Sequence, residues 1–150
     1  MPVSEQQLHE LLMYCINFAQ TMLKDSGEFY PFGANVTADG KLGAVGAHDG
    51  EEHPEPQALY QTLAGAFTAG ARNGELLAVA LAANVNVPPQ FSAPFPDAVR
   101  VHLETSGYSR LVYIPYRLSR KGLLRKSTVA ELSEPFSVEI RPSFFAAPSA

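Results

Sequence analysis

Apolar residues near the start of the chain recur three and four positions apart, the spacing of one face of a helix. Ser4 is a suitable N-cap, Gln7 completes a capping box with it, and Gly27 suits the position just after a helix. No basic residue lies within a helical turn of Cys15 to activate its thiol, so we expect this cysteine to be buried. The predicted core-facing stripe consists of Leu8, Leu11, Leu12, Cys15, Phe18, Ala19 and Met22.

A second helical pattern begins at Pro56, a favoured first residue of a helix, and ends at Asn73 and Gly74. Gly65 and Gly70 keep this helix thin, so we expect it to lie close against a sheet. Its predicted buried face contains Leu59, Leu63, Ala66, Phe67 and Gly70.

Alternating apolar and polar residues between turn signals predict the strands. Asp39 and Gly40 form a hairpin signal between two short strands, and this pair favours a type I′ turn. Two further strand candidates near the end of the chain are weaker. The predicted strands are 32–38, 42–47, 76–87, 98–105 and 109–117, followed by the weaker 127–132 and 136–140.

This element order predicts an α+β fold with a single, mainly antiparallel sheet of about five strands and two helices. Written along the chain, the order is α-β-β-α-β-β-β, with two optional strands after it. The order resembles roadblock and profilin-like domains in topology, a likeness that carries no function with it. We expect residues 1–150 to form one domain, with 142–150 either a disordered tail or an arm that docks.

Composition and charge exclude several classes of protein. The chain is 46% hydrophobic with a net charge of −4, which is unlike a disordered protein, and its single cysteine excludes an internal disulfide. No apolar run is long enough to span a membrane and the start of the chain carries no secretion signal. The sequence therefore predicts a cytoplasmic protein without membrane contact.

The charge is distributed unevenly along the chain. Residues 1–97 carry a net charge of −8, whereas residues 98–150 carry +4. Such a dipolar chain favours self-association or a charged partner, and an uneven but merely solvated surface is the alternative.

An acidic segment precedes the second predicted helix and contains His48, Asp49, Glu52 and His53. Imidazole and carboxylate ligands suit Zn, Mn or Fe, and Glu52 would be the general base of a metal-assisted hydrolase. The spacing matches no zinc or calcium signature, however, and acidic residues before a helix are also explained by its dipole. We therefore expect no cofactor and keep a divalent metal as the alternative.

Polar residues alternate along the predicted central strands. If the strands pair with their apolar faces aligned, one face carries a ligand or partner surface made of Asn84, Asn86, Arg100, His102, Glu104 and Tyr113. His102 and Glu104 would be an acid–base pair, although residues two apart on a strand are separated by about 6–7 Å. A solvated sheet face is the alternative interpretation.

Five basic residues cluster at the end of the fifth predicted strand and just after it: Arg117, Arg120, Lys121, Arg125 and Lys126. Phosphate binding, contact with an acidic protein and a solvated turn are the possible roles. The chain as a whole is acidic, and basic and aromatic residues do not interleave as they do in single-strand binders. We therefore expect no nucleic-acid partner.

Gly27–Ala34, with the sequence Gly-Glu-Phe-Tyr-Pro-Phe-Gly-Ala, and the later Asp49–Pro54 resemble a small bacterial domain family. Val99–Glu104 and Ile114–Tyr116 are further matches, and the resemblance implies no catalytic residues. The expected function is a non-enzymatic binding or regulatory module that acts through protein–protein contact and forms a homodimer. The alternatives are the metal-assisted hydrolase and an immunity-type or chaperone-like binder whose acidic segment meets a basic target.

Overall fold

The computed structural model describes residues 3–46, 55–124 and 127–145, and its elements follow the order that the sequence predicts. The helices are α1 (Glu5–Ser26) and α2 (Pro56–Arg72), with a short 3-10 turn, η1 (Pro89–Phe91). The strands are β1 (Phe32–Thr37), β2 (Leu42–Val45), β3 (Leu76–Asn86), β4 (Asp97–Thr105), β5 (Tyr108–Lys121), β6 (Ser127–Leu132) and β7 (Phe136–Glu139).

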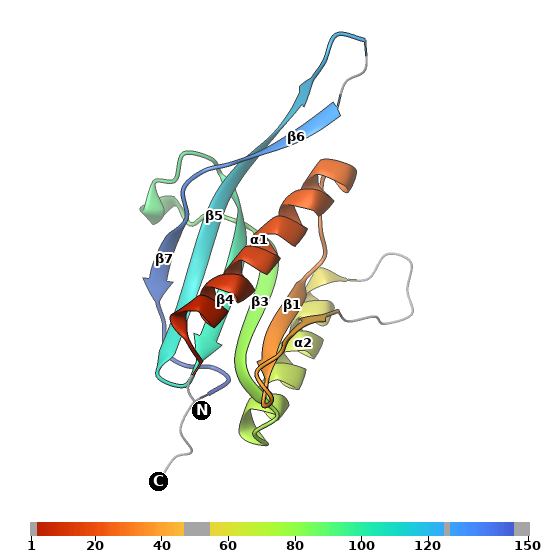
Figure 1. The fold of residues 1–150 in the computed structure, drawn as a ribbon. Coiled ribbons are helices and arrows are strands. Elements are labelled where there is room, and N and C mark those ends of the chain that lie inside the picture. Colours follow the sequence, from red (N-terminus) through yellow and green to blue (C-terminus); the bar gives the residue numbers. More distant parts are fainter. Residues whose placement is uncertain (1–2, 47–54, 125–126, 146–150) are drawn as a thin grey trace.

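The strands form one antiparallel sheet in the order β2-β1-β3-β4-β5-β6, with β7 also paired to β5 (Figure 1). The α+β prediction is confirmed, and the sheet has seven strands rather than about five. The long strand β5 accounts for the difference: β7 pairs with its first half and β6 with its second half. The β5–β6 hairpin extends beyond the rest of the sheet (Figure 1).

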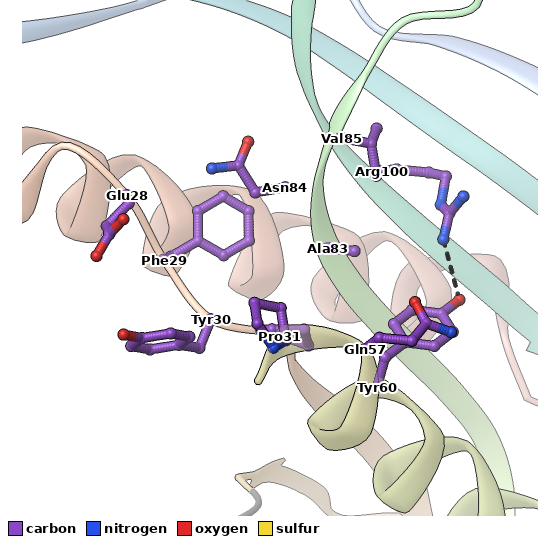
Figure 2. A pocket seen from close by; sticks show the side chains of 11 residues that line it. Glu28, Phe29, Tyr30, Pro31, Gln57, Tyr60, Ala83, Asn84, Val85 and Arg100 are labelled. Carbon is purple, nitrogen blue, oxygen red and sulfur yellow. Dashed lines mark hydrogen bonds between the residues drawn. The ribbon is translucent and has the colours of Figure 1, made fainter. Parts of the chain in front are cut away.

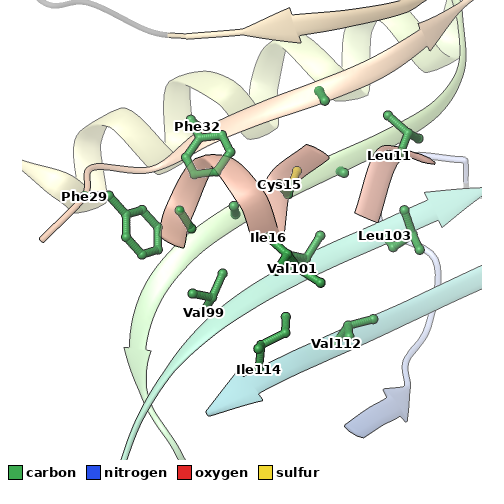
Figure 3. Close-up of a cluster of buried hydrophobic side chains, with 14 of the residues drawn as sticks. Leu11, Cys15, Ile16, Phe29, Phe32, Val99, Val101, Leu103, Val112 and Ile114 are labelled. Carbon is green, nitrogen blue, oxygen red and sulfur yellow. The ribbon is translucent and has the colours of Figure 1, made fainter. Parts of the chain in front are cut away.

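Helix α1 covers one face of the sheet, and its ends are set by local chemistry. Ser4 and Gln7 form both arms of the predicted capping box, and Gly27 ends the helix with a φ of 75°. Cys15 is fully buried in the cluster beneath α1 (Figure 3). Burial raises the pKa of the Cys15 thiol to about 12, so the predicted inert, buried cysteine is confirmed.

Helix α2 packs on the opposite face of the sheet, behind β1 and β3 in Figure 1. The residues of β3 divide between the helices: Ala80 and its even-numbered neighbours lie in the cluster under α1, whereas Val79 and Leu81 contact α2. Gly33 of β1 permits the close approach, because a Cβ there would lie 2.6 Å from the Phe67 ring. The molecule is therefore layered helix, sheet, helix over β1 and β3.

The hairpin between β1 and β2 departs from the predicted turn type. Gly40 has a φ of 84°, but Asp39 does not have the positive φ that the first position of a type I′ turn needs. The backbone hydrogen bonds of Thr37 and Gly40 close a loop of more than two residues. In this loop the Gly40 N–H donates to the Thr37 carbonyl at 2.8 Å. The hairpin prediction is right, and the turn assignment is wrong.

Neither helix described by the structure is long and apolar enough to cross a membrane.

Candidate functional site

The six residues predicted to form one polar surface lie on both faces of the sheet. The register pairs Asn84 with Val99 and Asn86 with Asp97, which places both asparagines on the face that α1 covers further along β3. Arg100, His102 and Glu104 lie on the α2 face. The assumed shared face is wrong because β3 buries both of its faces, the alanines under α1 and the larger residues under α2.

Tyr113 pairs with Arg100 across β4 and β5 and so lies on the α2 face. Its ring stacks on Phe136, with centroids 5.1 Å apart, and both rings contact Phe91 of η1. Tyr113 is buried by this aromatic cluster. The cluster gives Tyr113 a packing role under the loop between β3 and β4.

Glu104 is a fully buried carboxylate that accepts five hydrogen bonds. His102 Nε2 lies 2.8 Å from Oε1, and the Ser109 hydroxyl donates to the same oxygen at 3.0 Å. The predicted separation of about 6–7 Å along the strand is thus bridged by the side chains. The remaining three donors are backbone N–H groups of Ser143, Phe144 and Phe145, at 2.8, 2.7 and 2.6 Å.

This arrangement holds Glu104 in its ionised form. Burial acts to raise the carboxyl pKa, but the hydrogen bonds from His102 and the three amides outweigh it and lower the pKa to about 2. Charge-assisted bonds of this kind are stronger than neutral ones. Glu104 is thus a structural anchor for residues 143–145, and it is unsuited to exchange protons with a substrate.

Phe144 completes the anchor on the apolar side. Its ring lies 4.7 Å from the His102 ring and 6.0 Å from Phe67 of α2, centroid to centroid, and it is buried. The sequence leaves two alternatives for residues 142–150, a disordered tail or an arm that docks. The part of this segment that the structure describes docks on the fold. Sequence reasoning missed these donors, although two adjacent phenylalanines in a short tail were a signal that it packs on something.

A cavity of about 550 Å³ lies beside the first turn of α2 (Figure 2). It exists because β1 stops pairing at Phe32 with Ala82, whereas β3 continues to Asn86 and leaves an edge uncovered. Residues 28–31 pass across the opening from one side, and α2 closes it from the other. Two of the predicted surface residues, Asn84 and Arg100, line this cavity.

Arg100 is held at this cavity by Tyr60 of α2. Its Nη2 donates to the Tyr60 hydroxyl at 3.2 Å, and its guanidinium carbon lies 5.6 Å from the centre of the Tyr60 ring. Within residues 3–46, 55–124 and 127–145, no carboxylate pairs with Arg100, and its buried Nε has no hydrogen-bond partner. Asn84, by contrast, accepts a 2.8 Å bond from the Tyr116 hydroxyl.

The β5–β6 hairpin carries the most exposed apolar residues described. Leu123 and Leu124 are fully solvent-accessible at its end, next to the exposed Arg120 and Lys121. Arg117, at the base of the hairpin, is already paired with Glu131 at 2.5 Å. Arg125 and Lys126, the other members of the predicted basic cluster, lie outside the described residues.

The predicted metal ligands His48, Asp49, Glu52 and His53 also lie outside the described residues, so the metal hypothesis stays a prediction. Within the part of the chain that the structure describes, no group of three or more His, Cys, Asp or Glu side chains is arranged to hold a metal ion.

Comparison with models of known protein families yields no match. None of the curated proteins compared with the chain matches it, and no solved structure does.

Proposed function

We propose that this protein is a cytoplasmic, non-enzymatic binding module that acts through protein–protein contact, with the β5–β6 hairpin as its contact element and a second copy of the chain as its partner. The observation that carries the proposal is the pair of fully exposed leucines at the end of a hairpin that extends beyond the sheet.

Turns are usually rich in polar residues and glycine, and exposed apolar residues that gather in one place mark contact sites. Transfer of one leucine side chain from water to an apolar contact contributes about 1.5–3 kcal/mol. Leu123 and Leu124 are both fully exposed, so their own chain does not bury them and does not gain this free energy. A partner that covers them would gain it.

A second copy is favoured by the charge of the chain. The hairpin is basic through Arg120 and Lys121, whereas residues 1–97 carry a net charge of −8. Exposed acidic residues of that half include Glu5 and Glu10 on α1. In a two-fold symmetric pair each basic hairpin meets the acidic half of the other copy, so the same contact forms twice.

The surroundings of the predicted acid–base pair, His102 and Glu104, also support a role without catalysis. His102 and Glu104 face the docked residues 143–145 and are buried, so the acid–base pair is committed to holding the fold.

Sedimentation equilibrium tests the proposal with the purified protein and the double variant Leu123→Ser, Leu124→Ser. Both leucines are fully exposed, so their replacement should leave the fold intact. We expect the wild-type protein to dimerise at low salt and to dissociate as ionic strength rises, and the variant to be a monomer.

Leu42→Ser on β2 is the matched control, because Leu42 is a partly exposed leucine away from the hairpin, and it should still dimerise. A wild-type monomer at low salt would overturn the proposal, as would a double variant that dimerises normally. Co-sedimentation of the wild-type protein, but not the variant, with anionic lipid vesicles would instead assign the leucines to a membrane surface.

A further inference from the structure

We propose that the cavity beside the first turn of α2 binds a small organic monocarboxylate with an apolar body, and that Arg100 recognises its carboxylate. The cavity of about 550 Å³ lies within the usual size range of small-molecule sites. This site is separate from the β5–β6 hairpin and does not depend on its role.

Arg100 lacks a charged partner among the described residues. A guanidinium that is partly withdrawn from water normally has a carboxylate or phosphate partner, because an uncompensated charge is costly there. Arg100 instead has one neutral partner, the Tyr60 hydroxyl, and a buried Nε without any among the described residues. The guanidinium therefore has capacity for an anion, and it is held in place by Tyr60 (Figure 2).

The walls of the cavity combine apolar side chains with amide groups. Phe29, Tyr30 and Pro31 form an aromatic and apolar side, while Gln57 and Asn84 supply amide groups (Figure 2). An apolar wall with a few polar groups and one cation is the usual composition of a site for an organic acid. The Asn84 side-chain oxygen is occupied by Tyr116, which leaves its NH₂ group as the donor on that side.

The first turn of α2 restricts the charge of the ligand. Helix N-termini often bind phosphate through free N–H groups, but here the Glu55 carboxylate already accepts from the N–H groups of Gln57 and Ala58, at 3.1 and 2.7 Å. Glu55 also adds a negative charge near the cavity, and Glu28 lines it at the end away from Arg100 (Figure 2). One cation among these carboxylates favours a single negative charge over a phosphate.

Isothermal titration with 3-phenylpropionate tests this site, with 3-phenylpropanamide as its neutral analogue and inorganic phosphate as the competing anion. We expect the carboxylate to bind about tenfold or more tightly than the amide, because only it forms a charge-assisted pair. Phosphate should bind more weakly than the carboxylate.

Arg100→Gln should weaken carboxylate binding by about tenfold or more. Arg110→Gln is the matched control, since Arg110 is an arginine of the neighbouring strand outside the cavity, and it should bind like the wild type. Tyr60→Phe removes only the hydroxyl that positions Arg100, so it tests the site even where Arg100→Gln fails to fold, and we expect several-fold weaker binding.

Four results would overturn the assignment. Three are comparisons: equal binding of the carboxylate and its amide, tighter binding of phosphate, and equal losses in the Arg100 and Arg110 variants. The fourth is the absence of any heat of binding at millimolar 3-phenylpropionate.

Discussion

A single carboxylate, Glu104, connects three separate parts of the chain. It takes donors from its own strand through His102, from the next strand through Ser109, and from residues 143–145 about 40 positions later. A buried charge is tolerated only when its hydrogen-bonding capacity is met, and five donors meet it here. The loss of this charge should therefore affect the whole fold.

We expect Glu104→Gln to lower the free energy of unfolding by about 3 kcal/mol at pH 7, because a neutral amide replaces the charge-assisted acceptor. The folded-state pKa of about 2 lies below the usual 4.5, so the ionised carboxylate stabilises the fold above pH 4.5 and this contribution is lost as pH falls towards 2. Urea unfolding of both proteins between pH 7 and pH 2 measures the effect, and the difference between them should shrink towards zero.

Glu139→Gln is the control for this experiment. Glu139 is an exposed carboxylate 4.0 Å from Arg110, and its loss should change stability by less than about 1 kcal/mol. A difference between wild type and Glu104→Gln that stays constant across the pH range would contradict the assigned role of Glu104.

Sequence reasoning at the residue scale identified the right strand and missed the partners. The polar alternation of their strand points to His102 and Glu104, whereas the amide donors of residues 143–145 have no side-chain signature. Phe144 and Phe145 indicate that this segment packs, but not that its backbone meets Glu104. Arg100 is one of the predicted surface residues and Tyr60 is not, because the Tyr60 hydroxyl reaches Arg100 only through the packing of α2 on β3 and β1.

At the scale of elements, local chemistry was enough to place most boundaries. Ser4 and Gly27 are local signals for the ends of α1, and Pro56 and Asn73 are local signals for the ends of α2. Both helices begin and end where those signals lie. The alternation predicts that β5 ends at Arg117, whereas the strand continues to Lys121. Its last residues lack an apolar alternation because they pair only with β6, in the hairpin beyond the sheet.

The fit of α2 on the sheet leads to a prediction about two glycines. A Cβ at Gly33 would lie 2.6 Å from the Phe67 ring and 2.8 Å from the Ala80 carbonyl oxygen, so Gly33→Ala should cost about 1–3 kcal/mol through overpacking. Gly65 lies within α2 and faces open space, so Gly65→Ala should stabilise the protein by about 0.5–1 kcal/mol. Urea unfolding measures both variants, and a neutral Gly33→Ala would show that α2 packs less closely than described.

At the scale of the whole molecule, the sheet is covered on both faces, and the sequence did not predict this. The alternation along β3 separates small from large apolar residues, and a one-sided sheet would place the small ones towards solvent. The alanines instead lie under α1, where their size lets the helix approach closely. Which layer covers a face depends on helix packing, and strand periodicity contains no information about it.

The second face is completed by the end of the chain, so its removal should weaken the whole molecule. Deletion of residues 143–150 removes three amide donors from Glu104 and uncovers the site of Phe144 against Phe67 and His102. We expect a loss of about 4 kcal/mol or more in the free energy of unfolding, since a buried phenylalanine alone contributes about 3–5 kcal/mol.

Deletion of only residues 146–150 is the matched control, because it keeps all three donors and Phe144, and it should unfold at the wild-type urea concentration. In the longer deletion, Glu104→Gln should cost much less than in the full chain, because the carboxylate has then lost three of its five donors. Additive effects of the deletion and the substitution would contradict this coupling. They would show that Glu104 and residues 143–145 stabilise the fold independently of each other.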